Sequence, residues 1–237
     1  MFRKMLLQML HKEEIMATTE SPALHHSAPR SIMQLLTKSW VDKVLAGIAT
    51  VPFIYSIVAN YHNIHWNVPS ILWLVDLLII ISTMVFRKAP ERVTPNPWFW
   101  ALAFVATYWG FLTWRFQDDG RALAPAAVAN TIAVLGTAIE LWGRASLGRS
   151  IGFVPAQRDI VIHGAYRFVR HPIYSGVFIG VIADGLTYWS FRNFLLNSVF
   201  VSLFMIKSLV EESFLKEDAT YAAYMKKVRW HWFPGLA

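Results

Sequence analysis

Six long apolar segments, separated by polar stretches, dominate the hydrophobic pattern of the chain. A helix needs about 20 apolar residues to cross a bilayer, and most of these segments approach that length. Backbone polar groups in lipid have to be satisfied within the segment, so such segments predict helices. The pattern therefore predicts an all-α fold, a polytopic bundle of about six transmembrane helices. The segments are 43–61, 71–86, 97–114, 123–143, 173–191 and 194–210.

The last two apolar segments predict a helical hairpin, because only the polar pair Arg192–Asn193 separates them. Pro172 is well placed to begin the first of these helices, since proline is favoured in a first helical turn. Glu211 and Glu212 are expected to end the second helix. The residues that follow, up to Trp230, have helical spacing and predict an amphipathic tail helix at the membrane interface.

The pattern divides the chain into three regions. Residues 1–42 form a predicted cytosolic or interfacial segment, which begins with a short amphipathic stretch. Residues 43–143 form a four-span membrane scaffold. Residues 144–237 contain the helical hairpin, the tail helix and most of the candidate chemistry.

Composition supports a membrane protein. The chain is 55% hydrophobic and 16% charged, whereas a soluble domain carries about 25% charged residues. The absence of cysteine excludes disulfides, thiolate nucleophiles and Cys-ligated metal sites. The net charge of +7 is best explained by basic loops that face the cytoplasm and anionic membrane lipids, so no nucleic-acid partner is expected.

The distribution of basic residues predicts the orientation. With six spans and a cytoplasmic N-terminus, 19 of the 22 basic residues fall on the inner side. This asymmetry follows the positive-inside rule. We therefore expect a multi-pass protein with both termini cytoplasmic, and segments 144–172 and 211–237 then share one face.

Several polar residues fall within or near the apolar segments. Asp76, Glu140 and Asp184 are expected to face the bundle interior or a cavity, because charges in hydrocarbon are costly. For Asp184, a structural hydrogen bond to a neighbouring helix is favoured over a proton relay. His62 and His65 have a spacing that suits a metal but lack a clear third ligand, so no metal site is predicted.

The polar segment His163–Gly176, HGAYRFVRHPIYSG, lies directly before and within the fifth apolar segment. Its arginines and the N-terminus of the following helix would suit a carboxylate or phosphate. The antiparallel return of the hairpin brings His171, Tyr174 and Glu211 to the same depth. The alternative is a basic loop that binds lipid headgroups, with Glu211 and Glu212 paired to arginines of the segment.

The sequence GAYRFVRHPIYSG, followed by EESFL and YAAY, resembles the isoprenylcysteine carboxyl methyltransferase family and its phospholipid methyltransferase relatives. The resemblance covers roughly residues 140–234. It implies an integral membrane enzyme that transfers a methyl group from S-adenosylmethionine to a small lipophilic substrate, which enters from the bilayer. The cytosolic loop, the hairpin and the tail helix would form the cofactor site.

The resemblance also implies residue roles. Arg170 and Glu212 would be catalytic, Lys207 would bind the substrate, and Glu212 or His171 could serve as a general base for an amine or hydroxyl acceptor. The family tends to carry arginine at the position of Lys207, and lysine cannot make the same bidentate contact with a carboxylate. A lipidic acid, amine or phenol therefore stays open as the acceptor. The implied cofactor-binding residues are Asp159, Ile160, Val161, Tyr166, His171, Pro172, Ile173, Tyr174 and Glu211.

Two alternatives stay open. Membrane sterol reductases that bind NADPH share the R-H-P-x-Y-x-G pattern, but they typically have asparagine where this chain has Ile173. That difference favours methyl transfer. The other alternative is a non-enzymatic membrane scaffold or lipid-binding protein.

Overall fold

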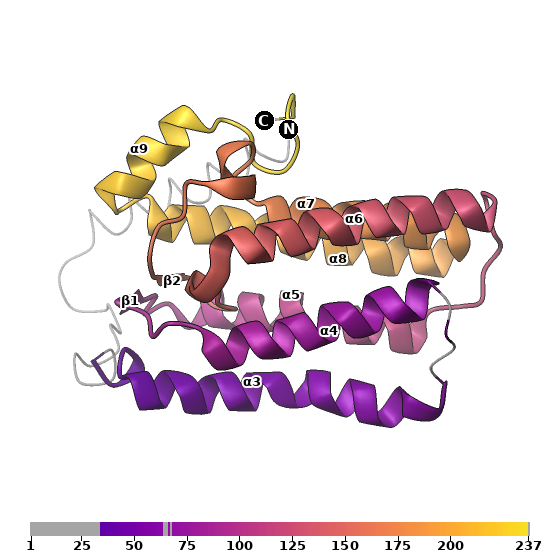
Figure 1. Ribbon diagram of the computed structural model, residues 1–237, viewed down its shortest axis with the longest axis horizontal. Coiled ribbons are helices and arrows are strands. Elements are labelled where there is room, and N and C mark those ends of the chain that lie inside the picture. The colour runs from indigo at the N-terminus through magenta and orange to yellow at the C-terminus, as the bar shows by residue number, and fades with distance from the viewer. Residues whose placement is uncertain (1–33, 64–65, 67, 237) are drawn as a thin grey trace.

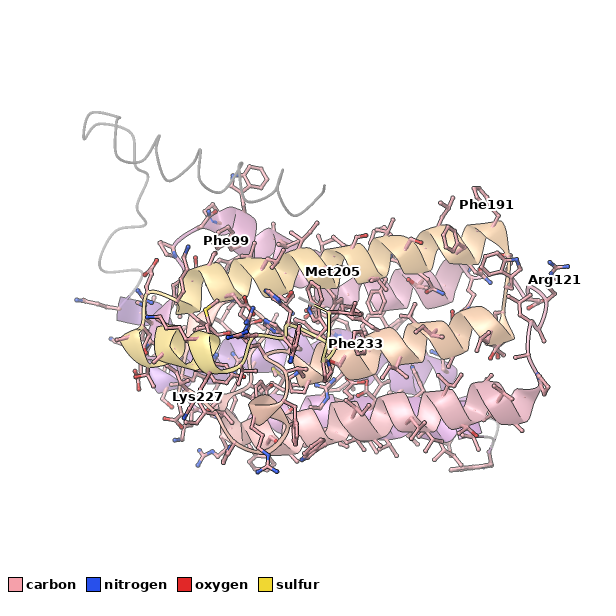
Figure 2. All side chains as sticks on the ribbon, turned by 90° about the horizontal axis from the view of Figure 1, so that it is seen from above. Phe99, Arg121, Phe191, Met205, Lys227 and Phe233 are labelled. Atoms are coloured by element: carbon pink, nitrogen blue, oxygen red, sulfur yellow. The ribbon has the colours of Figure 1, made fainter. Side chains whose placement is uncertain are left out.

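The computed structural model describes residues 34–63, 66 and 68–236, and long helices form a bundle within this part of the chain (Figure 1). The predicted all-α class is confirmed. Figure 2 shows Lys227 near one end of the bundle and Arg121 and Phe191 near the other. The helices are α3 (Ser39–Asn60), α4 (Val68–Phe86), α5 (Pro97–Phe116), α6 (Ala126–Leu147), α7 (Pro172–Thr187), α8 (Phe191–Leu215) and the short α9 (Ala219–Lys227).

Several of these helices are strongly apolar, as a membrane protein requires. Among the described residues, three helical stretches are long and apolar enough to cross a bilayer: α3, Ala126–Ser150 and α8. Ser70–Phe86 and α7 are apolar but shorter. The predicted count of six spans and the cytoplasmic termini stay predictions. The amphipathic stretch at the start of the chain and His65 lie outside the described residues.

Proline lies in the first turn of two helices, as predicted for Pro172. Pro97 opens α5, and the side chain of Asn96 accepts a hydrogen bond from the Trp98 backbone N–H. Pro172 opens α7 directly after His171. Proline costs nothing at this position because the first N–H groups of a helix have no partner within the helix.

The hairpin turn lies three residues earlier than predicted. α7 ends at Thr187 and α8 begins at Phe191, so Arg192–Asn193 belongs to the first turn of α8. Ser190 caps this helix by accepting a hydrogen bond from the Asn193 backbone N–H. The Asn193 side chain is 1% exposed and binds the backbone of Asp118, a long-range contact that a local pattern does not reveal.

The C-terminal region also differs from the prediction. Glu211 and Glu212 do not end α8, which continues to Leu215. The predicted tail helix is interrupted before Asp218, whose carboxylate caps α9 by accepting hydrogen bonds from the next backbone N–H groups. This capping satisfies donors that would otherwise lack partners.

A two-stranded sheet, which the sequence did not predict, joins two loops at one end of the bundle. Strand β1 (Arg92–Val93) pairs antiparallel with β2 (Ala156–Gln157). The pairing ties the loop after α4 to the loop before α7.

Helices α6 and α7 approach each other closely at glycines. A Cβ atom at Gly176 would lie 2.5 Å from the carbonyl oxygen of Gly136 and 2.6 Å from the backbone nitrogen of Glu140. A Cβ atom at Gly143 would lie 2.8 Å from the Ile173 side chain. Small residues allow this backbone contact, which is common between membrane helices.

We predict that Gly176→Ala destabilises the protein by about 1–3 kcal/mol, because the added methyl group overpacks the contact between α6 and α7. Thermal unfolding of the purified protein in detergent measures the effect. Gly180→Ala is the matched control, since a Cβ atom there meets nothing within 4 Å. Equal thermal midpoints for the two variants would contradict the close contact.

Candidate active site

A cavity of about 370 Å³ brings together most of the residues predicted for the site. Its polar part is lined by the loop before α7 and by α7, α8 and α9. Of the predicted residues, only Pro172 and Glu212 are absent from the lining. The predicted residues that line it are Asp159, Ile160, Val161, Tyr166, Arg170, His171, Ile173, Tyr174, Lys207 and Glu211.

The other part of the cavity is apolar and lies among helices of the N-terminal scaffold. Phe53, Leu77 and Ile80 form a buried cluster from α3 and α4 that contributes to the lining. Phe111 and Phe153 pack against that cluster and also line the cavity. The cavity thus borders both the polar segment of the sequence and the apolar interior of the bundle.

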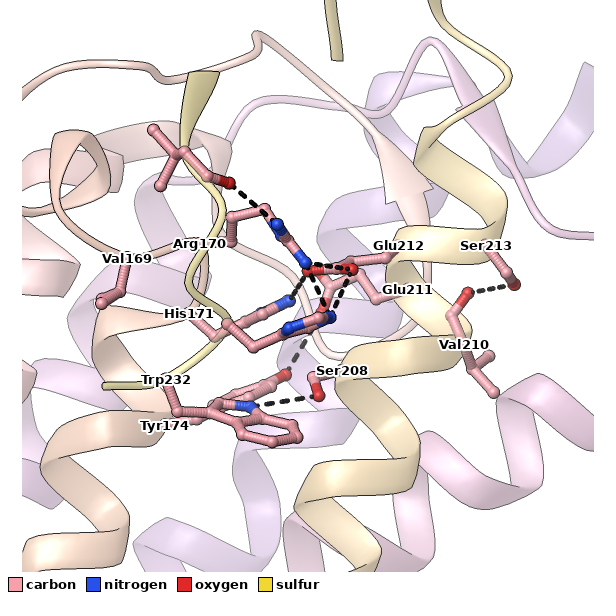
Figure 3. Close-up of polar contacts among 12 residues, drawn as sticks. Val169, Arg170, His171, Tyr174, Ser208, Val210, Glu211, Glu212, Ser213 and Trp232 are labelled. Carbon is pink, nitrogen blue, oxygen red and sulfur yellow. Dashed lines mark hydrogen bonds and ion pairs between the residues drawn. The ribbon is translucent and has the colours of Figure 1, made fainter. Parts of the chain in front are cut away.

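A buried ion cluster is centred on Glu212 (Figure 3), and two of its members, Arg170 and His171, line the cavity. The Arg170 guanidinium donates to both carboxylate oxygens of Glu212, at 2.6 and 3.2 Å. The Nε2 atoms of His171 and His231 lie 2.9 and 3.1 Å from the same carboxylate. Both oxygens are therefore occupied, and the pairing of Glu212 with an arginine, one of the two interpretations of the sequence, is present.

The same cluster holds the C-terminal segment in place. Arg170 Nη1 donates to the carbonyl oxygens of Val228 and Arg229, at 2.8 and 2.9 Å. The indole N–H of Trp232 donates to the Ser208 hydroxyl at 3.2 Å. His231 and Trp232 were not among the predicted residues, because their contacts join segments that are far apart in sequence.

Glu211 points in a different direction from Glu212 and lines the cavity. Successive residues of a helix are separated by about 100° around its axis, so adjacent glutamates reach different surroundings. The Tyr174 hydroxyl donates to Glu211 at 3.2 Å, and the Tyr174 ring stacks on His171 with centroids 5.3 Å apart. Within the described part of the chain, no basic side chain forms an ion pair with Glu211.

Lys207 lies one helical turn before Glu211 and is 6% exposed. Its ammonium group donates to the Thr107 hydroxyl at 3.1 Å and lies 5.5 Å from the centroid of the Phe204 ring. No carboxylate among the described residues pairs with it. Glu211, one turn further along α8 in the same cavity lining, interacts electrostatically with this ammonium group. An anionic ligand group in the cavity would give the buried ammonium group a direct partner.

Several titratable side chains around the polar part of the cavity have pKa values that differ from their usual ones. Burial, together with nearby Glu211, raises the pKa of Tyr166, and burial also raises the pKa of Tyr221 and Tyr224. These hydroxyls therefore stay protonated at physiological pH, and the Tyr224 hydroxyl donates a hydrogen bond to the carbonyl oxygen of Tyr166. Burial, followed by repulsion from a neighbouring arginine, lowers the pKa of Arg158 to about 10, so its guanidinium stays charged at neutral pH.

The acids within the helices have defined partners. Asp184 accepts hydrogen bonds from Gln117 and Asn197, at 2.8 and 2.7 Å, which confirms its structural interpretation. Asp76 and Glu140 line the cavity and both pair with Arg144. At the surface, Asp159 pairs with Lys88, and both side chains are about half exposed.

Comparison with known proteins identifies the matching region. Residues 125–222 match the family model of the phospholipid methyltransferases. This match confirms the family resemblance predicted from the sequence and indicates a membrane methyltransferase. No curated protein matches the chain in sequence. The matched region includes α6, α7, α8 and the polar segment between α6 and α7.

We predict that Arg170→Met destabilises the protein by about 3–5 kcal/mol, because it leaves the Glu212 carboxylate buried without its main partner. The C-terminal segment, residues 228–236, should also become sensitive to protease. Thermal unfolding and mass spectrometry after limited proteolysis measure the two effects. Exposed Arg167 offers the control Arg167→Met; similar behaviour of both variants would contradict the role of the buried pair.

Proposed function

We propose that this membrane methyltransferase uses S-adenosylmethionine as its methyl donor and acts on a small lipophilic acceptor. The observation that carries the proposal is the cavity, which borders the family's polar segment on one side and an apolar helical interior on the other. A polar cofactor and an apolar acceptor can meet only where a polar binding region lies directly beside an apolar one. Its volume falls within the range of about 300–1,000 Å³ that is usual for small-molecule sites.

The residues in the polar part fit this cofactor. Glu211 faces the cavity with only Tyr174 as a hydrogen-bond partner among the described residues, so it retains acceptor capacity. We propose that it binds the ammonium group or the ribose hydroxyls of the cofactor. Tyr166, held by its neighbour Tyr224, offers an aromatic face for the adenine or the sulfonium.

The bound cofactor would supply a methyl carbon already activated by its positively charged sulfur. The protein then has to align the acceptor with that carbon and exclude water, and such positioning can provide much of the rate enhancement. α9 borders the polar part through Tyr221 and Tyr224, while α3, α4 and α5 would hold the acceptor. The polar part is expected to face the cytoplasm.

The catalytic roles expected for Arg170 and Glu212 stay predictions. The contacts of Glu212 favour a positioning role, because Arg170, His171 and His231 already occupy its oxygens. In this arrangement Glu212 orients the His171 ring, and His171 lines the cavity. His171 is then the better placed general base if the acceptor is an amine or hydroxyl.

We predict that purified protein binds S-adenosylmethionine and its demethylated product in calorimetry, whereas NADPH does not bind. Glu211→Gln should weaken binding about tenfold or more, since a hydrogen bond to a charged group contributes about 1.5–3 kcal/mol. Glu217→Gln is the control, because Glu217 is exposed and lies outside the cavity lining.

Binding of NADPH alone would instead identify a reductase, and binding of none of the three ligands would favour a scaffold protein. Unchanged cofactor affinity in Glu211→Gln would show that the cofactor lies elsewhere.

We further propose that the acceptor carries an acidic group, such as a carboxylate, near Lys207. Lys207→Gln should reduce methyl transfer to lipidic carboxylates by about tenfold or more while leaving cofactor affinity unchanged. Lys216→Gln, at an exposed position after α8, is the control. A mass-spectrometric screen for lipids that gain one methyl group provides the readout. Equal products from Lys207→Gln and the unmodified protein would argue for a neutral or basic acceptor.

A further inference from the structure

A second hollow of about 430 Å³ lies between α4 and α6, outside the main cavity. The two helices are neighbours in the bundle (Figure 1). Its walls are mostly apolar, and two arginines lie at one end: Arg144 in the last turn of α6 and Arg149 in the turn that follows it. The residues that matter here are Ile79, Phe86, Leu141, Ala145, Arg144 and Arg149, and we call this surface the α4–α6 groove.

Arg144 separates the groove from the cavity, because it lines both. Arg144 is 9% exposed. Its Nη2 atom forms ion pairs with Glu140 and, at 3.3 Å, with Asp76. Its Nε–H is buried and has no hydrogen-bond partner among the described residues. A buried guanidinium with an unused donor is costly, so an additional acceptor in this position would be favourable.

Arg149 adds a second positive charge at the mouth of the groove. It is exposed, and its Nε donates to the carbonyl oxygen of Phe86 at 2.9 Å. In the described part of the chain, no carboxylate pairs with Arg149. The groove therefore combines apolar walls with the positive charge of Arg149 and the unused Nε–H donor of Arg144 at one end, which matches a hydrocarbon chain joined to an anionic head group.

We propose that the α4–α6 groove binds an anionic amphiphile from the bilayer, with a phosphate or carboxylate head group and a hydrocarbon chain. We also infer that the groove is the entrance through which the lipophilic acceptor reaches the cavity. When the anionic head group binds, it replaces Asp76 and Glu140 as the partner of the Arg144 guanidinium. The Arg144 side chain then moves out of the wall that separates the groove from the cavity. Only the identity of the passing lipid as the methyl acceptor rests on the proposed function.

Photo-crosslinking tests both parts of the proposal. The full chain in phosphatidylcholine vesicles is irradiated with a phosphatidic acid that carries a diazirine on its acyl chain, and mass spectrometry maps the label. Label is expected at the groove segments 79–86 and 141–149 and at Leu77 and Phe53 in the cavity. Ala145→Trp fills the groove without changing the cavity lining, and should reduce the cavity label about tenfold, equivalent to ~1.4 kcal/mol.

Leu78→Trp is the matched control, because Leu78 is 53% exposed on α4 and lines neither hollow. Undiminished cavity label in Ala145→Trp would place the entrance elsewhere and overturn the inference. Calorimetry with S-adenosylmethionine on the same samples keeps the two proposals separate. Groove labelling without cofactor binding would contradict the proposed function alone, and cofactor binding without groove labelling would contradict the groove alone.

A separate experiment tests whether the groove requires an anionic head group. Arg149→Gln should reduce groove labelling by the phosphatidic acid about fivefold, the expected contribution of one basic residue to binding an anionic lipid. Labelling by a diazirine diacylglycerol of the same chain length should not change. Excess inorganic phosphate should compete poorly, since it lacks the chain. Equal loss for both probes, or full competition by free phosphate, would overturn the anionic-lipid assignment.

Discussion

The buried pair between Arg170 and Glu212 is the interaction on which the polar part of the structure depends. It joins three segments that are distant in sequence: the loop before α7, the last turns of α8 and the C-terminal segment. Removing two charges from water is costly, and the cost is offset only when each donor and acceptor finds a partner. Two histidines and two backbone carbonyls complete that set, so the arrangement forms as a unit.

This unit also explains why two adjacent glutamates differ in environment. Glu212 points into the ion cluster, which fixes the C-terminal segment. Glu211 points into the cavity, and its carboxylate can accept further hydrogen bonds besides the one from Tyr174. The helix geometry fixes the difference, because a single rigid α8 presents both side chains. A well-ordered structural carboxylate thereby positions the neighbour that is available for a ligand.

The hydrophobic pattern was sufficient to predict the helices, because each membrane helix satisfies its backbone internally and needs only a long apolar segment. The candidate site was also predictable, since the polar segment and Glu211 stand out between apolar helices. The β1–β2 pairing and the contacts of Asn193 were not predictable, because they join residues far apart in sequence. The interruption before Asp218 required recognition of a cap within an otherwise helical spacing. The role of Arg144 between two hollows depends on packing in three dimensions, which no local pattern contains.

The apolar wall of the cavity comes from two parts of the chain. Phe53, Leu77 and Phe111 belong to α3, α4 and α5, which precede the region that matches the phospholipid methyltransferase family, whereas Val177 and Phe204 lie within that region. The tight glycine contact between α6 and α7 leaves little freedom on the matched side of the cavity. Under the proposed function, a different acceptor size would be accommodated more readily by the N-terminal helices than at the glycine contact between α6 and α7. Proteins that share this C-terminal half can diverge in the molecules they modify, and their first three described helices are the part to compare when sorting them by acceptor.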